Sequence, residues 1–267
     1  MNVKFTRKIQ ILNIKSHKFY YTSILSMTKD DYDLDGIIKK SFEEAIEYFN
    51  KNGIKIEGLK LRIVKSPWSF YDIFILLFVD QGNLGIYFPS KKIFIIKKQL
   101  EKTANKILDE LSNNNIKDSS IISIKLSKNS IISYPFYLDM KNIKNNIMKT
   151  VTDIIIAHEI GHAVIRSIGS KGEWKASAFE YLVYFYKNEF YNYPEVYKII
   201  EENIKVCKTY IEENKKLNIY ELGRCYGNII IHKNKQSTNI NIKDIIEEIK
   251  NLSEKDIINT IKNHIIK

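Results

Sequence analysis

The sequence has few of the residues that mark fibrous, low-complexity or disulfide-rich chains. Its 267 residues include 4 Pro, 10 Gly and 2 Cys. These counts exclude collagen-like and low-complexity classes and a disulfide framework. The two cysteines, Cys207 and Cys225, lack the spacing of a metal-binding pair. We therefore predict that both are buried free thiols in a reducing cytoplasm.

Long hydrophobic runs are also missing. The longest, Ile73–Val79, has the length of a strand, whereas a membrane-spanning helix needs roughly 18 apolar residues. Residues 1–15 carry positive charges, but no apolar block of the kind found in a signal peptide follows them. The sequence therefore predicts a cytoplasmic protein with no membrane span.

Arginine is scarce in an otherwise basic chain. Lys and Arg total 42 against 31 Asp and Glu, a formal net charge of +11, and arginine stands only at Arg7, Arg62, Arg166 and Arg224. Proteins that read bases or phosphates favour arginine, because its planar fork makes paired hydrogen bonds. The charge is therefore interpreted as scattered, solvated lysine, and nucleic-acid binding is the less favoured hypothesis.

The 44% hydrophobic and 12% aromatic content is enough for a folded core. Apolar residues at helical spacing predict helices over 38–49 and 99–111. Alternating or continuous apolar runs predict strands at 59–64, 72–79, 85–89 and 93–96, with weaker strand patterns over 3–25 and 121–133. The first half of the chain therefore indicates a small sheet accompanied by helices.

The second half is typical of a helical unit. Helices are expected at 143–168, 173–190, 195–214, 217–231, 242–252 and 254–266, and Ser253 with Asp256 is typical of a capping box at the start of the last one. The fold class is α+β, with an N-terminal α/β lobe over 1–149 and a helical lobe over 150–267.

One motif carries chemistry. Residues 158–162 read His-Glu-Ile-Gly-His, the HExxH pattern, inside an apolar helical stretch. His158 and His162 share a helix face, so both imidazoles can bind one zinc ion. Glu159 is close enough to take a proton from a water held by that ion and to return it to a leaving amine. Gly161 lets another backbone approach this helix closely.

The third zinc ligand has two candidates. Ile165 and Ile168 stand where a metzincin would carry its further Gly and His, which excludes that class. If the chain turns near residues 170–171, an antiparallel partner helix places residues 178–182 opposite the two histidines. This places Glu180 in the window and favours it as the ligand, and Glu173 on the same helix is the alternative.

The arrangement resembles a gluzincin metallopeptidase, with HExxH on one helix and a glutamate ligand on the next. Gly85–Pro89 and Ile93–Ile95 resemble the hairpin whose edge strand pairs with substrate in such enzymes, and residues 178–190 resemble the glutamate helix, including that of lethal-factor-like catalytic domains. At the position where these domains commonly carry the ligand, this chain has Ser177. The resemblance implies a zincin-like fold and Zn²⁺-dependent hydrolysis of a peptide or protein substrate.

The oxyanion that forms during peptide hydrolysis needs a further hydrogen-bond donor. Tyr184 and Tyr220 are the first candidates, followed by Arg224 and His232, and Gly223 and Gly227 indicate close helix packing around Tyr220. The predicted function is a zinc metallopeptidase. The alternative is a zincin that has lost its activity and serves as a binding or regulatory module.

Overall fold

The computed structural model describes residues 33–64, 84–112, 121–127, 130–166, 170–235 and 240–264. The strand patterns expected over 3–25 and 72–79 lie outside these residues. The molecule is mostly helical with a small mixed sheet, which is compatible with the predicted α+β class. Within the described residues, no helix is long and apolar enough to cross a membrane.

The helices follow the predicted ranges closely, with shifts of a few residues at their ends. They are α1 (Leu34–Lys51), α3 (Lys97–Ser112), α4 (Ile143–Ile165), α5 (Ser170–Lys187), α6 (Val196–Glu212), α7 (Ile219–Lys233), α8 (Ile242–Asn251) and α9 (Glu254–Asn263), with 3₁₀ turns at Met140–Asn142 and Phe190–Asn192. The capping box of Ser253 and Asp256 is present at the start of α9.

A three-stranded sheet forms from β1 (Lys60–Val64), β2 (Gly85–Phe88) and β3 (Lys92–Ile96), in the order β1-β3-β2. β1 runs parallel to β3, and β2 pairs antiparallel with β3 as the predicted hairpin. Among the strands of the described residues, β2 therefore stands at an edge of this sheet, with one row of backbone groups not used by β3.

A second sheet pairs β4 (Ile121–Ile124) with β5 (Tyr134–Tyr137). The strand pattern over 121–133 is confirmed only for β4, and β5 was not expected. Pro135 lies inside β5. A proline has no backbone N–H to donate to a neighbouring strand, so a sequence that contains one does not read as a strand. This strand matters because Tyr134 reaches the site described below.

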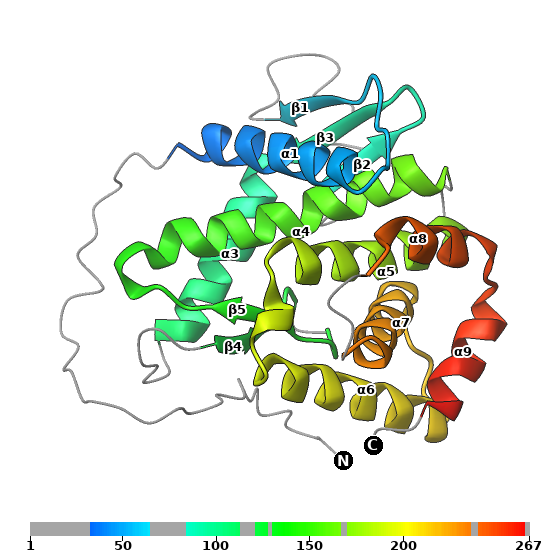
Figure 1. Cartoon of the computed structure of the whole chain (residues 1–267). Coiled ribbons are helices and arrows are strands. Elements are labelled where there is room, and N and C mark those ends of the chain that lie inside the picture. The colour runs from blue at the N-terminus through cyan, green and yellow to red at the C-terminus, as the bar shows by residue number, and fades with distance from the viewer. Residues whose placement is uncertain are drawn as a thin grey trace.

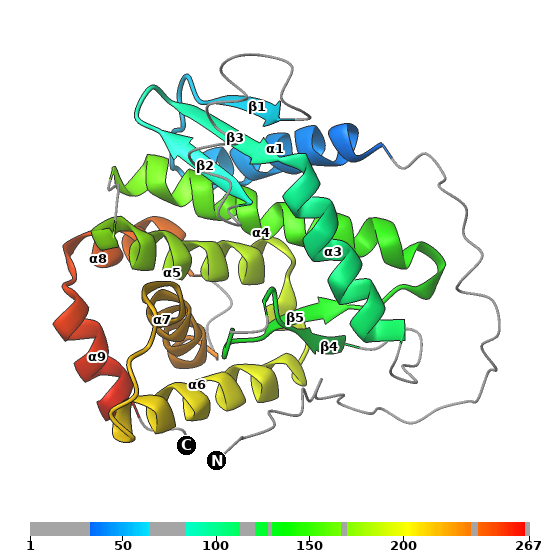
Figure 2. The ribbon, with the colours of Figure 1, turned by 180° about the vertical axis from the view of Figure 1, so that it is seen from behind.

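α4 occupies the centre of the molecule. Figure 1 shows α1 and the three-stranded sheet on one side of α4 and α5 on the other, and Figure 2, seen from the opposite side, shows α3 crossing in front of α4. Ile154, Ile156 and Ile160 of α4 are buried among these neighbours. α4 also runs across the predicted lobe boundary between residues 149 and 150, so both halves of the chain pack on one helix.

Glycines allow the helices around α4 to approach closely. A Cβ at Gly161 would lie 3.1 Å from the Cα of Ala176, so α5 packs directly on the HExxH helix. A side chain at Gly223 would collide with the backbone carbonyl of Trp174, and one at Gly227 would crowd Ala178. The close helix contact predicted from Gly223 and Gly227 is therefore confirmed, and α7 is held against α5.

The prediction of free thiols is wrong. Cys207 of α6 and Cys225 of α7 form a disulfide, with their Cα atoms 6.2 Å apart. The two cysteines are 18 residues apart in sequence, and the packing of α6 against α7 brings them together. Because disulfides persist mainly in oxidising compartments, the thiols no longer support a cytoplasmic location.

We expect the disulfide to stabilise the fold. Closing a loop of this length lowers the entropy of the unfolded chain and contributes about 3 kcal/mol. The Cys225→Ser variant should lose about that much free energy of unfolding in urea titrations. The Cys207→Ser/Cys225→Ser double variant is the control and should not respond to dithiothreitol. If reductant leaves the wild-type midpoint unchanged, the two sulfurs are not bonded in solution.

Candidate metal centre

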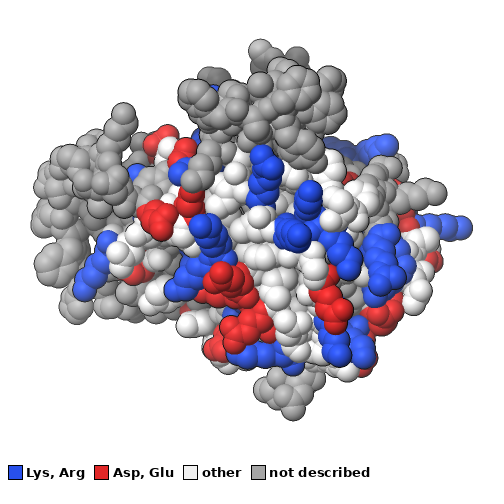
Figure 3. Space-filling view, turned by 90° about the horizontal axis from the view of Figure 1, so that it is seen from above, with Lys and Arg blue, Asp and Glu red and all other residues white. Residues whose placement is uncertain are grey.

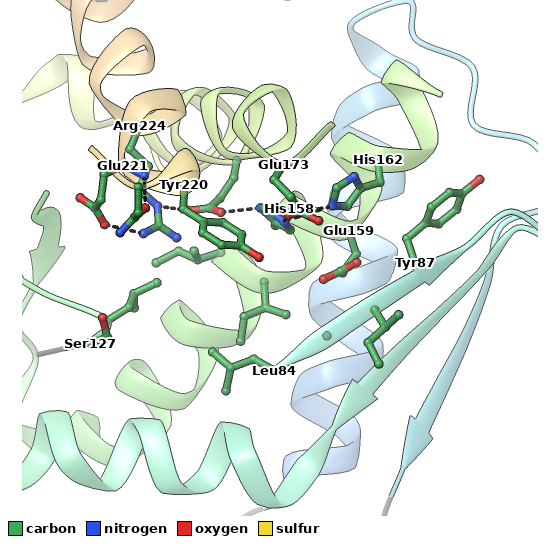
Figure 4. A pocket seen from close by; sticks show the side chains of 17 residues that line it. Leu84, Tyr87, Ser127, His158, Glu159, His162, Glu173, Tyr220, Glu221 and Arg224 are labelled. Carbon is green, nitrogen blue, oxygen red and sulfur yellow. Dashed lines mark hydrogen bonds and ion pairs between the residues drawn. The ribbon is translucent and has the colours of Figure 1, made fainter. Parts of the chain in front are cut away.

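Three polar side chains of α4 project toward α5 and β2. His158 and His162 stand one helical turn apart, and their Nε2 atoms are 3.2 Å from each other. Glu159 is 5% exposed and lies beside the two rings (Figure 4). The close approach of the two imidazole nitrogens is the first requirement for a shared metal ion, and HExxH spacing on a continuous helix supplies it.

Glu173 of α5 completes a triangle with the histidines. Its Oε2 lies 3.2 Å from His158 Nε2 and 3.4 Å from His162 Nε2. Three ligands at about 2.0–2.1 Å from a tetrahedral zinc ion stand about 3.3 Å from one another. The three atoms therefore have the separations of three ligands of one zinc ion, and they form the one cluster of metal-ligating residues found among the described residues.

Glu180, the favoured ligand in the sequence, lies on the other side of His158. Its Oε2 is 2.9 Å from His158 Nδ1, while its Oε1 accepts hydrogen bonds from the Tyr134 hydroxyl and from Arg224 Nε. A carboxylate on Nδ1 holds a proton on that nitrogen, so Nε2 is the nitrogen that would bind a metal ion once its own proton is displaced. Glu180 therefore contacts His158 on the side away from the triangle formed by the two Nε2 atoms and Glu173.

The helix bounds explain why Glu173, and not Glu180, lies beside the two Nε2 atoms. α4 ends at Ile165 and α5 begins at Ser170, so the midpoint between the two helix ends comes about three residues earlier in the sequence than the assumed reversal point at 170–171. With that midpoint as the reversal point, Glu173 stands opposite His162, and Ser177 stands opposite His158. Ser177 has no carboxylate, and Glu180 reaches His158 from the next turn.

Arg224 connects Glu180 to a loop that the sequence did not associate with the site. Arg224 Nη1 donates to Glu221 at 3.0 Å. The Glu221 carboxylate also accepts the backbone N–H groups of Ile131 and Ile132 and the Ser130 hydroxyl. Tyr134 and Glu221 were both missed, because neither stands in a motif. Glu221 does lie three residues before Arg224 in the first turn of α7, the spacing of a helical ion pair.

The two candidate tyrosines have different positions. The Tyr220 ring lies 5.9 Å from the His158 ring and lines the cavity. Tyr184 is buried in the core, and its hydroxyl donates to the Pro135 carbonyl at 2.7 Å. Arg224 lines the cavity, whereas His232 pairs with His264 at 3.1 Å. Tyr220 and Arg224 are therefore the candidates that the fold brings to the histidines.

Burial and charge set the protonation of the cluster. Burial raises the pKa of Glu159 to about 6, although the neighbouring imidazoles oppose this. Burial also raises the pKa of Glu173, but hydrogen bonds with His158 and His162 outweigh it and hold the pKa at about 2. Burial lowers the pKa of His158, and its bonds with Glu173 and Glu180 reverse this and raise it to about 10. A metal ion that bound here would have to displace a proton from this cluster, so its binding would weaken as the pH falls.

A cavity of about 560 Å³ opens over these groups, between α4, α7 and the edge strand β2. β2 approaches so closely that a Cβ at Gly85 would lie 2.9 Å from Glu159 Oε1 and 2.8 Å from Ile155. Tyr87 of β2 stacks on His162 with ring centroids 6.5 Å apart. The edge strand thus runs along the cavity, with Glu159 directly beneath its first residue.

Comparison of the chain with protein-family models, curated proteins and solved structures gives no significant match.

Proposed function

We propose that the protein is a zinc-dependent metallopeptidase of gluzincin type. The observation that supports this most strongly is the triangle of His158 Nε2, His162 Nε2 and Glu173 Oε2, with sides of 3.2, 3.2 and 3.4 Å. Two imidazoles and one carboxylate, with a fourth position open to a cavity, form a ligand set typical of catalytic zinc. In this proposal Glu173 takes the role of third ligand, and Glu180 orients His158.

The surroundings of the triangle support a zincin-like arrangement. The helix that carries HExxH packs against a helix that carries the third carboxylate. β2 borders the cavity as an edge strand, with Gly85, Ile86 and Tyr87 along it. An extended peptide can add to such an edge through main-chain hydrogen bonds. This placement would hold a peptide bond over Glu159 and the histidines.

The residues of the chain then have separate roles. A zinc ion in the triangle would polarise the peptide carbonyl and lower the pKa of a water molecule toward roughly 7. Glu159 would accept the proton of the attacking water and deliver it to the leaving amine. Burial and the neighbouring carboxylates Glu173 and Glu159 raise the pKa of Tyr220, so its hydroxyl stays protonated and can donate to the carbonyl oxygen.

The proposal is tested by metal content and peptide hydrolysis of the full-length chain. We expect one zinc per chain after dialysis, and cleavage of denatured casein that a chelator stops and added zinc restores. His158→Ala should lose both properties, because it removes a ligand. The matched control is His232→Ala, which changes a histidine outside the cavity and should keep both. A wild-type chain that binds no zinc would overturn the proposal.

Two other functions remain as alternatives. A zincin that serves as a binding module would bind zinc and leave peptides intact, even though Glu159 is in place. Nucleic-acid binding receives little support from the surface, because Figure 3 shows positive and negative side chains side by side on the face it presents. Several lysines of the described residues are paired with acids, including Lys97 with Asp35 and Lys51 with Glu47.

A further inference from the structure

A second pair of histidines, away from the cavity, holds the C-terminal end of α9. Nε2 of His264, the C-cap residue of α9, lies 3.1 Å from Nδ1 of His232 in the last turn of α7. His264 is 8% exposed, and the side chain of His232 is 10% exposed. The backbone carbonyl of His264 accepts a hydrogen bond from Lys208 of α6 at 2.7 Å. The end of α9 is therefore attached to both α7 and α6, and Figures 1 and 2 show α9 beside one end of α6.

α9 depends on these contacts because it is short. It has 10 residues, and the apolar side chains that it buries are those of Ile257 and Ile261. Isolated helices of fewer than about 12–15 residues are marginal in water. A small apolar contact and a few polar contacts therefore keep α9 docked and helical, and the loss of one polar contact can shift the balance toward release.

The number of protons on the two rings decides whether the contact between them is favourable. A hydrogen bond between two imidazoles needs one N–H and one nitrogen with a free lone pair. The pair meets this condition when both rings are neutral and when one ring is charged. When both rings are charged, the two facing nitrogens each carry a hydrogen and repel each other. The contact between His232 and His264 therefore tolerates one positive charge and opposes a second.

The surroundings of the pair also oppose a second positive charge. Among the described residues, positive groups reach the pair from each element packed on the end of α9: Lys208 of α6 and Lys233 of α7. The carboxylate of Glu201 in α6 lies 3.7 Å from Nε2 of His232, and it also pairs with Lys235 at 3.2 Å. The one acid beside the pair is thus on the side of His232 and is shared with a lysine.

The direction of the pH effect follows from His264. Burial lowers the pKa of His264 from its ordinary value of 6.5 to about 4, and the nearby His232, Lys233 and Lys208 act in the same direction. In a released α9 the ring regains its ordinary pKa. The released helix therefore binds a proton that the docked helix excludes, and docking is fully favoured above pH 6.5 and weakens as the pH falls from 6.5 toward 4.

We propose that the contact between His232 and His264 makes the docking of α9 depend on pH, so that α9 is docked at neutral pH and is released from α6 and α7 in mild acid. The preceding helix, α8, stays in place because its contacts involve no histidine. The Tyr226 hydroxyl donates to Glu248 of α8 at 2.5 Å, and Lys175 of α5 donates to the carbonyl at the end of α8. This inference uses no residue of the zinc-ligand triangle and goes beyond the proposed peptidase function.

Hydrogen exchange of the full-length chain, followed by mass spectrometry at pH 7 and pH 5, tests the inference. After correction for the pH dependence of intrinsic exchange, the protection of amides 254–263 should fall by about tenfold or more at pH 5. The amides of α6 and α8 should keep their protection. The same result is expected with and without a chelator, because His158 and His162 take no part. Equal protection of α9 at both pH values, or loss of protection in α6 together with α9, would overturn the inference.

Variants of the pair tie the effect to the two rings. His264→Gln keeps a polar side chain that can pair with His232 and binds no proton, so the fall in α9 protection between pH 7 and pH 5 should disappear. In His232→Gln the amide oxygen can accept from a charged His264, so the fall should be smaller than in wild type. Asn263→Gln changes the exposed neighbouring residue and should behave as wild type.

The two glutamine variants also cover the case in which one of them undocks α9 at every pH. If His264→Gln leaves α9 unprotected already at pH 7, His232→Gln decides the question, because it keeps the titrating ring and changes only its partner. A fall in α9 protection as large as that of wild type, in either glutamine variant, shows that the titrating group lies elsewhere and overturns the inference.

Discussion

Replacing Glu159 by Gln is expected to lower kcat for peptide hydrolysis by about 10²–10⁴-fold, the usual contribution of a positioned general base. Glu159 is 5% exposed, lies beneath β2 and is not part of the ligand triangle. Glutamine has nearly the same shape and cannot accept the proton of a water molecule. The loss should therefore appear in kcat, measured with a fluorogenic peptide, while the zinc content stays at one per chain.

The control for Glu159→Gln is a carboxylate that has an ionic partner elsewhere in the fold. Glu44 of α1 pairs with Lys149 and Lys187, away from the cavity. Glu44→Gln should weaken this ion pair and leave kcat near the wild-type value. If Glu159→Gln keeps more than about a tenth of wild-type kcat, another group accepts the proton, and the assignment of Glu159 as the base is wrong.

The parts of the site that follow from local sequence were predictable. His158, Glu159 and His162 are fixed relative to one another by one helix, so their spacing in sequence determines their geometry. The pairing of β2 with β3 was predictable for the same reason, because a short turn joins the two strands. The positions of the site residues on α4 and of the edge strand beside them can therefore be predicted from sequence patterns that span only a few residues.

The parts that depend on packing between helices were not predictable in the same way. α5 is apolar on nearly all faces, with Ala176, Phe179 and Leu182 all buried, so no amphipathic pattern indicates which side meets α4. The choice between Glu173 and Glu180 depended on where the chain was assumed to reverse between α4 and α5. Moving that point by three residues changes which turn of α5 faces the histidines. The disulfide likewise depends on how α6 packs against α7. The separation of 18 residues between the two cysteines does not indicate that packing.

Substitution of the two glutamates separately is expected to distinguish the zinc ligand from the residue that orients it. Glu180→Gln keeps an acceptor for His158 Nδ1 and loses the charge, and changes to such outer partners typically cost 10–100-fold in metal affinity. Glu173→Gln replaces the carboxylate, whose oxygen lies 3.2 and 3.4 Å from the two histidine nitrogens, by a neutral amide that binds zinc more weakly. Its loss of zinc affinity should exceed that of Glu180→Gln.

The measurement is a competition titration against a chromophoric zinc chelator at fixed pH. The pH must be held because zinc would have to displace a proton from His158 in order to bind there. Glu180 is also bound to Arg224, so Glu180→Gln leaves this guanidinium with one carboxylate partner fewer and should lower the thermal midpoint more than Glu173→Gln does. A larger loss of zinc affinity in Glu180→Gln than in Glu173→Gln would reverse the two roles, since only a direct ligand can have the greater effect on the metal.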